Sequence, residues 1–355
     1  MAVPATVSIE RAAGRGGGVP GHGKARIQDV ATAAGVSIGT VSRVLNNDKT
    51  LSIRESTRNK IIAVSNQLDY VPNSSAIALR RQKTDTIGLV LDDVTNPVFS
   101  EIIAGVHAEC TLRDFNLVLL DAKDSARMMT GLVKNRYLDG LIVQSGYGLK
   151  DADLAKFSET VPTVLLNGPG IGGVPGVFLE EDVASEIATE YFLTERYSSV
   201  AFIGGSPGPS EDMRIEGFNR AIRNATKTGA RTAATVIRTD GWRAVDGTQA
   251  IAELLAGGDS YPEAIVIANN GLAVGAMSAL ADRGISIPHD VSVIAIQDTW
   301  LSEFLVPHLS TVRLGLRQLG KVVVRQLVDV ISGEAVEDHV VKDPKPRLIL
   351  RSSTR

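Results

Sequence analysis

The chain has 355 residues, of which 44% are hydrophobic and 22% are charged. This composition is typical of a soluble protein with two or three domains, and no apolar run approaches the roughly 18 residues of a membrane span. Residues 1–84 carry 12 Lys and Arg against 5 Asp and Glu, a net charge of +7, whereas the remainder carries 25 against 35, a net charge of −10. A basic head on an acidic body favours a polyanion as the partner of the head, although short N-terminal regions are also basic by chance.

The first 23 residues are rich in Gly, Ala, Pro and Arg and lack the apolar block of a signal peptide. We expect residues 1–23 to form a disordered tail, because they hold too few apolar side chains for a core. The only cysteine, Cys110, has no second cysteine for an intramolecular disulfide. These features predict a cytoplasmic protein with no membrane partner.

Residues 24–71 show the pattern of three short helices. The first is expected where apolar residues recur at helical spacing before Gly35, at Ile27, Val30, Ala31 and Ala34. Ser37 is placed to cap a second helix, whose inward face carries Val41, Val44 and Leu45. A third helix is predicted from a capping box in the sequence SIRE at 52–55. Two helices joined by a tight glycine turn are typical of a helix-turn-helix unit.

The outward face of the second helix is predicted to contact DNA. It carries Ser37, Ile38, Gly39, Thr40, Ser42, Arg43 and Asn46. Small residues at the start of the helix allow close approach to base edges, and Arg43 can form a bidentate hydrogen bond with guanine. Thr40 and Ser42 suit phosphate oxygens, whereas Ile38 can only touch a thymine methyl group. This motif alone leaves open an ordinary antiparallel helix pair with a solvated face.

From residue 85 onward the chain alternates apolar segments with helical patterns. Eight segments have the pattern of buried parallel strands: TIGLVLDD, FNLVLLDA, LDGLIVQS, VPTVLLNG, SVAFIGGS, AATVIRTD, EAIVIANN and VSVIAIQD. Such alternation predicts doubly wound parallel sheets with helices on both faces, and the number of strands indicates two lobes. Ligands of these folds bind at the carboxyl ends of the strands. The candidate site residues at these ends are Asp92, Asp93, Asn167, Ser206, Asn269, Asn270, Gln297 and Asp298.

An enzymatic interpretation of the body finds little support in the sequence. The glycine-rich loop GGSPGPS at 204–210 fits no nucleotide-binding motif, and its two prolines remove backbone donors. The five histidines show no metal-ligand spacing, and no nucleophile motif such as G-x-S-x-G occurs. We therefore expect no enzyme activity, no cofactor and no catalytic or metal-binding residue.

Three blocks, in the order IQDVATAAGVSIGTVSRVLN, STRNKIIAVSNQLDYVPNSSAIALR and TIGLVLDDVTNPVF, resemble the LacI/GalR (lactose-repressor) family of bacterial transcription regulators. The resemblance covers roughly residues 25–354, and later blocks such as RGISIPHDVSVIAIQD and LVPHLSTVR follow in the order of the family. It implies a homodimer whose helix-turn-helix heads bind an operator in double-stranded DNA. It also implies a hinge helix and linker at 72–84, in which Leu79 wedges into the minor groove.

For the body, the resemblance implies two lobes of the periplasmic-binding-protein type, joined by three crossovers, with a small-molecule effector between them. The N-terminal lobe is expected at 85–176 with 313–333, and the C-terminal lobe at 177–312 with 334–355. The strand ends and the resemblance together predict the effector-binding residues Asp92, Asn96, Asn167, Phe178, Arg214, Trp242, Asn269 and Gln297. Core packing is the alternative for Phe178 and Trp242.

The predicted pocket departs from the family pattern where acids are common. Asn270 stands in place of an Asp, Gln297 stands where many members have an Asp, and Asn167 replaces the Asp of several sugar-responsive members. A one-residue shift would restore Asp298 as the pocket acid. Amides both donate and accept hydrogen bonds, so a neutral polyhydroxyl ligand such as a carbohydrate is the expected effector. We thus predict a repressor that its effector releases from DNA; a solute-binding protein without a regulatory role is the alternative.

Overall fold

The computed structural model describes residues 25–46, 48, 50–70, 83–121, 131, 137–146, 154, 158–256 and 261–355. The chain divides into two units, a head within residues 1–81 and a body that comprises 82–355. The predicted tail at 1–23, most of the predicted hinge at 72–84 and Leu79 lie outside the described residues. Among the described helices, none combines the length and the apolar composition that crossing a lipid bilayer requires.

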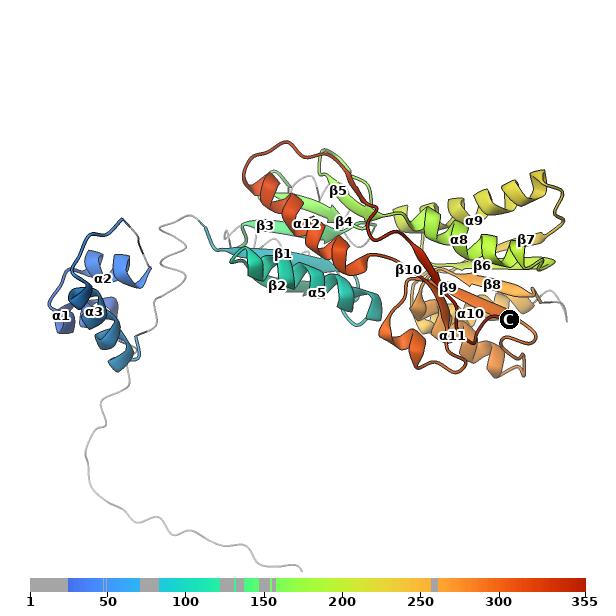
Figure 1. Ribbon diagram of the computed structural model, residues 1–355, viewed down its shortest axis with the longest axis horizontal. Helices are drawn as coiled ribbons and strands as arrows, with labels where there is room; N and C mark the ends of the chain where they lie inside the picture. Colours follow the sequence, from blue (N-terminus) through green and yellow to red (C-terminus); the bar gives the residue numbers. More distant parts are fainter. Residues whose placement is uncertain are drawn as a thin grey trace, which may run out of the picture. The chain divides into compact units, whose positions relative to one another are not determined.

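The described part of the head consists of three helices around a small apolar core (Figure 1). They are α1 (Ile27–Ala34), α2 (Ile38–Leu45) and α3 (Glu55–Gln67). Gly35 ends α1 in the left-handed conformation, with a φ of 73°, as the predicted glycine turn requires. Ser37 caps α2, also as predicted, by accepting a hydrogen bond from the Thr40 amide. The core is formed by Val30, Ala31, Ala34, Val41, Val44 and Ile61.

The capping box expected at Ser52 does not form. Helix α3 begins at Glu55, after Arg54, and no side chain caps it. Leu51 and Ile53 pack against the core of the head, and the segment that carries them is not helical. Packing of these two apolar side chains thus outweighs the local capping preference, and the helix starts later than predicted.

In the described chain, the first lobe of the body holds a six-stranded parallel sheet in the order β11-β5-β4-β3-β1-β2. Its strands are β1 (Thr86–Leu91), β2 (Asn116–Asp121), β3 (Gly140–Gln144), β4 (Thr163–Leu166), β5 (Gly176–Leu179) and β11 (His339–Val341). Helices α5 (Pro97–Leu112) and α12 (Leu316–Ile331) lie side by side against one face of this sheet (Figure 1). β3 and β4 are buried along their whole length, as central parallel strands usually are.

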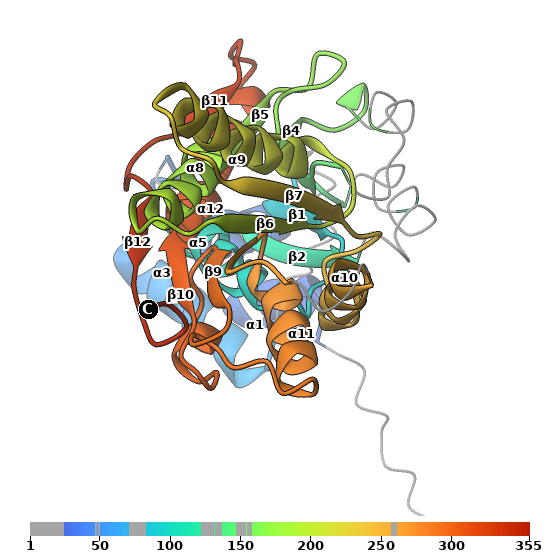
Figure 2. The same cartoon turned by 90° about the vertical axis from the view of Figure 1, so that its right-hand side faces the viewer.

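The second lobe holds a sheet that, among the described residues, has the order β12-β10-β9-β8-β6-β7. Its strands are β6 (Ser199–Gly204), β7 (Ala233–Arg238), β8 (Ala264–Ile267), β9 (Ser292–Ile296), β10 (Ser310–Arg313) and β12 (Arg347–Ile349), and only the pair of β10 and β12 is antiparallel. Helices α8 (Glu181–Thr194) and α9 (Pro209–Lys227) cover one face, whereas α10 (Ala244–Leu255) and α11 (Asn270–Ala281) cover the other (Figure 1 and Figure 2). A short 3-10 helix, η1 (Trp300–Glu303), precedes β10.

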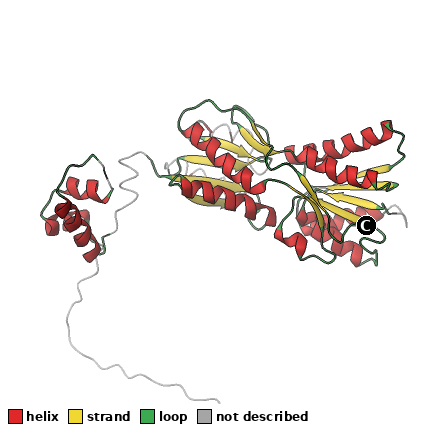
Figure 3. Cartoon of the chain, viewed as in Figure 1, coloured by secondary structure: helices red, strands yellow, loops and turns green. Residues whose placement is uncertain are grey.

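The predicted α/β body with two parallel-sheet lobes is confirmed. Each of the eight predicted strand segments contains an observed strand, namely β1 to β4 and β6 to β9. Figure 3 shows both sheets with helices packed against them. Their apolar runs form a continuous core between sheets and helices, which is why the sequence pattern was sufficient to locate these strands.

The chain crosses between the lobes three times: after β5, between β10 and α12, and between β11 and β12. Two predicted boundaries are wrong, because β5 and β11 both belong to the first sheet. The predicted second-lobe segments 177–312 and 334–355 therefore begin too early. β5 and β11 hold only 4 and 3 residues. β11 is too short for a sequence pattern, and β5 follows β4 with no described helix between them, so the alternation of strand and helix that located the other strands does not reveal it. Main-chain pairing near the sheet edge determines the place of both strands.

Candidate functional site

In the head, the residues predicted to contact DNA lie on α2 or at its ends. They are Ser37, Ile38, Gly39, Thr40, Ser42, Arg43 and Asn46. The first three are exposed, and the other four are half-buried. The start of the helix is therefore its most open part, as close approach to base edges requires. Leu79, predicted to enter the minor groove, lies outside the described residues.

Arg43 is held by two side chains of the loop after α2. Its Nε donates a hydrogen bond to Asp48 Oδ2 at 2.7 Å, and its Nη2 donates one to Thr50 Oγ1 at 2.9 Å. Hydrogen bonds from Thr50 and Arg43 lower the pKa of the Asp48 carboxyl to about 2. The Nε–H group and one N–H group of Nη2 are thus used within the head. Nη1 and the second N–H group of Nη2 can still donate two parallel hydrogen bonds to a guanine. The sequence analysis missed Asp48 and Thr50, because their contact with Arg43 depends on how the loop folds back.

In the body, a cleft of about 1040 Å³ lies between the carboxyl ends of strands from both sheets. Seven of the eight predicted effector-binding residues line it: Asp92, Asn96, Asn167, Arg214, Trp242, Asn269 and Gln297. The eighth, Phe178, is not among the residues that line the cleft. It lies inside β5, opposite Val340 of β11, rather than at the carboxyl end of a strand, so its side chain belongs to a face of the first sheet. Core packing, the alternative given for Phe178, agrees better with this position, and an effector contact by Phe178 stays a prediction.

Of Gln297 and Asp298, the two alternatives for the pocket residue after β9, only Gln297 lines the cleft. Gln297 lines the cleft, is 3% exposed and adopts a positive φ of 72°. Asp298 lies outside this cleft and forms ion pairs with Arg313 at 2.6 Å and Arg351 at 2.9 Å. Burial acts to raise the pKa of Asp298, but hydrogen bonds from Arg351, Thr311 and Arg313 together outweigh it and lower the pKa. Asp298 thus stabilises the fold, and an amide occupies the cleft.

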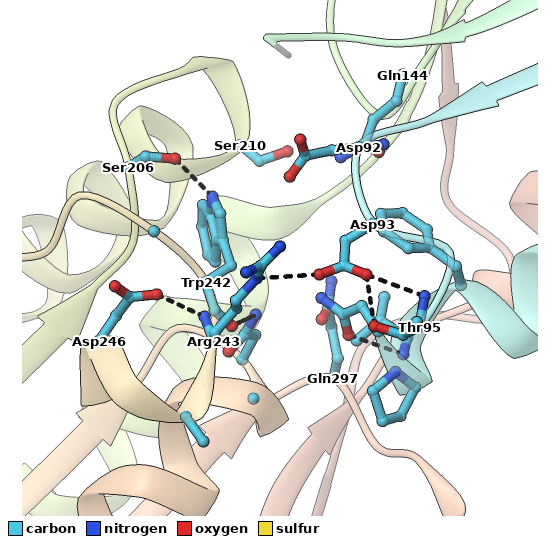
Figure 4. A pocket seen from close by; sticks show the side chains of 18 of the residues that line it. Asp92, Asp93, Thr95, Gln144, Ser206, Ser210, Trp242, Arg243, Asp246 and Gln297 are labelled. Carbon is cyan, nitrogen blue, oxygen red and sulfur yellow. Dashed lines mark hydrogen bonds and ion pairs between the residues drawn. The ribbon is translucent and has the colours of Figure 1, made fainter. Parts of the chain in front are cut away.

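Trp242 forms a wall of the cleft (Figure 4). Its ring Nε1 donates a hydrogen bond to Ser206 Oγ at 2.8 Å, and the guanidinium of Arg214 lies over the ring, 5.0 Å from its centroid. The ring packs against Gly205, where a Cβ atom would come within 2.4 Å of the indole carbons. The glycine-rich loop at 204–210 therefore makes room for an aromatic side chain, which explains its composition without a phosphate.

Arg214 is 2% exposed and forms an ion pair with a buried glutamate. Its Nε donates to Glu181 Oε2 at 2.6 Å. Glu211, three residues before Arg214 on α9, is also fully buried, and burial raises the pKa of Glu211 to about 7 although Arg214 opposes this effect. The sequence analysis identified Arg214 but missed both glutamates, since their burial is not visible in a local pattern.

Side chains of the two lobes meet across the cleft. Arg243 of the second lobe pairs with Asp93 of the first, with Nε and Oδ2 3.1 Å apart (Figure 4). Asn167 Nδ2 donates to Ser210 Oγ at 2.9 Å, and that hydroxyl donates back to the Asn167 carbonyl at 3.0 Å. These contacts link the carboxyl end of a first-lobe strand to the start of a second-lobe helix. Arg243 and Ser210 were not predicted, although each lies one or a few residues beyond a predicted strand end.

Two of the predicted amides also have structural roles. Asn96 caps α5 by accepting a hydrogen bond from the Val98 amide, and Asn269 caps α11 by accepting one from the Leu272 amide. Asn270 does not line the cleft but donates to Ser302 Oγ at 3.0 Å.

Within the described part of the chain, no three His, Cys, Asp or Glu side chains gather to form a candidate metal site.

A helix-turn-helix head joined to two parallel-sheet lobes around a polar cleft defines a class of protein, the DNA-binding regulator with a ligand-binding body. The model of "Bacterial regulatory proteins, lacI family" matches residues 26–73, and the "Periplasmic binding protein-like domain" model matches residues 189–354. A crystal structure of a LacI family transcriptional regulator from Mycobacterium smegmatis is 34% identical, with a TM-score of 0.69 over 76% of this chain and 98% of that one. The chain belongs to the lacI family of bacterial regulatory proteins.

Two further proteins extend the similarity to nearly the whole chain. The crystal structure of the Lac repressor dimer bound to operator and the anti-inducer ONPF is 25% identical, with a TM-score of 0.79 over 94% of this chain and 99% of that one. The ribose operon repressor of Escherichia coli strain K12 is 29% identical over 322 residues, which are 89% of this chain and 96% of the repressor. These proteins are transcription regulators rather than enzymes. The chain is accordingly a DNA-binding transcription regulator, and a solute-binding protein without a regulatory role is not favoured.

Proposed function

We propose that this regulator is a homodimeric repressor, which binds an operator through its two heads and leaves it when a carbohydrate-like effector enters the cleft. The observation that carries the proposal is the cleft itself, whose polar walls come from both lobes. A ligand held between two lobes favours one arrangement of them and thereby changes the separation of the elements that lead to the heads. The effector and the operator are then coupled through the lobes.

The proposed operator contacts begin with Arg43. Its guanidinium is pre-oriented by Asp48 and Thr50, which suits a bidentate hydrogen bond with a guanine in the major groove. The exposed Ile38, which is 44% open to solvent, suits a thymine methyl group. We also propose that Leu79 wedges between base pairs at the operator centre and bends the DNA there.

The proposed effector is an uncharged compound with many hydroxyl groups. Hydroxyl groups both donate and accept hydrogen bonds, and the cleft offers both kinds of partner, such as the carboxylate of Asp92 and the amide of Gln297. Gln297 Oε1 is buried and has no hydrogen-bond partner among the described residues, a state that a bound ligand would relieve. The indole of Trp242 suits the C–H face of a sugar ring, and the likeness to the ribose operon repressor supports the same class of ligand.

A second copy of the chain is the proposed partner of an apolar surface on the second lobe. This surface is made by Trp300, Phe304 and Val306, which are 61%, 73% and 90% exposed. The rings of Trp300 and Phe304 lie 6.3 Å apart between centroids, and large apolar side chains that are exposed side by side often mark an interface. We further propose that the protein acts in the cytoplasm, where its DNA is, and that the cleft binds its ligand without catalysis.

The test is a thermal-unfolding screen of the full chain against monosaccharides, disaccharides, polyols and nucleosides. A ligand at 100 times its dissociation constant adds about 2.7 kcal/mol to the free energy of unfolding. A compound that stabilises the wild type is then added to a complex with DNA selected from a random duplex library. Release of the DNA supports the proposal. Stabilisation that is equal in the Trp242→Ala variant would place the ligand elsewhere, and a ligand that strengthens DNA binding would contradict induction.

A further inference from the structure

Two buried glutamates lie behind the arginine of the cleft, in addition to the proposed effector contacts. Glu181 begins α8 and Glu211 lies in the first turn of α9, and both are 0% exposed. The two helices run side by side (Figure 1), which brings Glu181 Oε2 within 2.6 Å of the Nε of Arg214. Among the described residues, Glu181 Oε1 has no hydrogen-bond partner, and the one main-chain amide that acts on the Glu211 carboxyl group is that of Gly205.

This arrangement opposes folding, so a functional reason for it is expected. Fully buried carboxyl groups with so few hydrogen bonds destabilise a protein and are rare. Glu211 and Arg214 are three residues apart on one helix and share a face, so the guanidinium that is hydrogen-bonded to Glu181 also acts electrostatically on the carboxyl group of Glu211. Arg214 alone of the three lines the cleft, and the stacking of its guanidinium on Trp242 fixes its plane.

The other charges of the cleft add to the acidic excess. The described residues that line it include two arginines, and the second of these, Arg243, pairs with Asp93. The remaining charged side chains of the described lining are the aspartates Asp92, Asp240 and Asp246. Among the described residues of the lining, four carboxylates therefore stand against two guanidinium groups, before the two glutamates behind Arg214 are counted. This part of the lining disfavours an anionic ligand, because like charges in a partly desolvated site interact strongly.

We propose that Glu181 is a positioning residue that holds Arg214 against Trp242, and that Glu181 and Glu211 together offset the charge of Arg214, so that the cleft accepts uncharged polyhydroxyl compounds and rejects their phosphate esters and carboxylic acids. This inference rests on the effector site proposed above. Arg214 then acts through the direction of its N–H groups and not through attraction of an anion. A neutral polyhydroxyl compound gains hydrogen bonds from Arg214 without repulsion by the nearby carboxylates. Its phosphate ester is repelled by them and must compete with two glutamates for one guanidinium group.

Inorganic phosphate tests this inference without knowledge of the effector. Thermal unfolding of the full chain is followed as phosphate replaces chloride at constant ionic strength. The wild type is expected to show no saturable stabilisation by phosphate, whereas the Glu181→Gln/Glu211→Gln double variant is expected to bind it at least about tenfold more tightly. Adding Arg214→Ala to the double variant should remove the effect. If the double variant does not fold, Glu211→Gln alone is measured at about pH 8, where this carboxyl is ionised in the wild type.

Glu186→Gln is the matched control. Glu186 is also on α8 and also pairs with an arginine of α9, Arg220, at 2.6 Å, but that arginine, unlike Arg214, does not line the cleft. Saturable phosphate binding by the wild type, or a gain in the double variant no larger than in Glu186→Gln, would overturn the inference. Failure of the proposed function is a different result, namely that no sugar or polyol stabilises the wild type. Any hit is compared with its phosphate ester, which should bind at least about tenfold more weakly to the wild type.

Discussion

Replacing Glu211 by Gln is expected to stabilise the body above neutral pH, because in the wild type this carboxyl group ionises inside the protein. Glu211 is fully buried, and burial is the main cause that raises its pKa to about 7. The guanidinium groups of Arg214 and Arg238 and the amide of Gly205 offset part of that effect, and Asp212 adds to it. Gln has nearly the same shape as Glu and does not ionise. The variant therefore removes the titration with little change in packing.

The size of the effect follows from the two pKa values. The ordinary value for Glu is 4.5 and the folded value is about 7, and a difference of about 2.5 at 1.36 kcal/mol each corresponds to about 3 kcal/mol. Because the folded state binds the proton more tightly than the unfolded state, this stability is fully present below the ordinary pKa. It is lost as the pH rises through about 7. At about pH 8 the wild type has lost it, whereas the Gln variant has not.

Urea unfolding between about pH 5 and pH 8 measures this difference. The two tryptophans, Trp242 and Trp300, both lie in the body, so their fluorescence follows its unfolding. The free energy of unfolding of the wild type should fall relative to Glu211→Gln as the pH rises, and the gap should reach about 3 kcal/mol. Glu186→Gln serves as the control for removal of a less buried carboxyl group from the same pair of helices. Parallel curves for wild type and Glu211→Gln would refute the reasoning.

Further substitutions test the other parts of the molecule. Arg43→Ala should weaken binding to a selected operator by about 1–3 kcal/mol, mostly at one guanine; titration against operator variants checks this, and an equal loss on random DNA would argue against base recognition. Leu79→Ala should abolish bending at the operator centre, as gel mobility of circularly permuted fragments would report. Arg214→Ala should remove the response to effector while leaving operator affinity intact, so retained induction would show that the effector binds elsewhere. Gly205→Ala should displace the indole of Trp242 and weaken effector-induced thermal stabilisation, which an unchanged dissociation constant would disprove.

The sequence predicted those elements that depend on a few neighbouring residues, such as a helix cap or a run of apolar side chains. Ser37 and Gly35 sit at helix ends where capping and the left-handed conformation depend on one residue, and both predictions are confirmed. The same holds for strands such as β8, which has four successive buried apolar residues. Ser52 failed because two neighbouring side chains pack on the core, and β5 and β11 were missed because main-chain pairing, not side-chain pattern, determines them.

The candidate site was predictable where residues follow strands and unpredictable where two distant residues meet. Asp92, Asn167 and Gln297 were found because the carboxyl ends of parallel strands face one cleft. Glu181 pairs with Arg214 across 33 residues of chain, and only the packing of α8 on α9 brings the two together. An acid at a helix start has the pattern of a favourable interaction with the helix dipole, so nothing in the sequence distinguishes the buried Glu181 from an exposed one.

The contacts across the cleft suggest why a small ligand can control the lobes. The Arg243 side chain is 60% exposed, so its ion pair with Asp93 contributes at most about 1 kcal/mol. The hydrogen bonds between Asn167 and Ser210 add a similarly modest amount, about 1 kcal/mol each. Polar contacts of this size add little to the stability of the observed arrangement, whereas complete reversal of a two-state balance requires about 5.5 kcal/mol of differential affinity. A ligand that contacts Trp242 and Gln297 together with first-lobe carboxylates gains those contacts only when both lobes surround it. Differential affinity is therefore built into a cleft whose walls come from both sheets, and the weak native contacts leave the ligand to decide the arrangement.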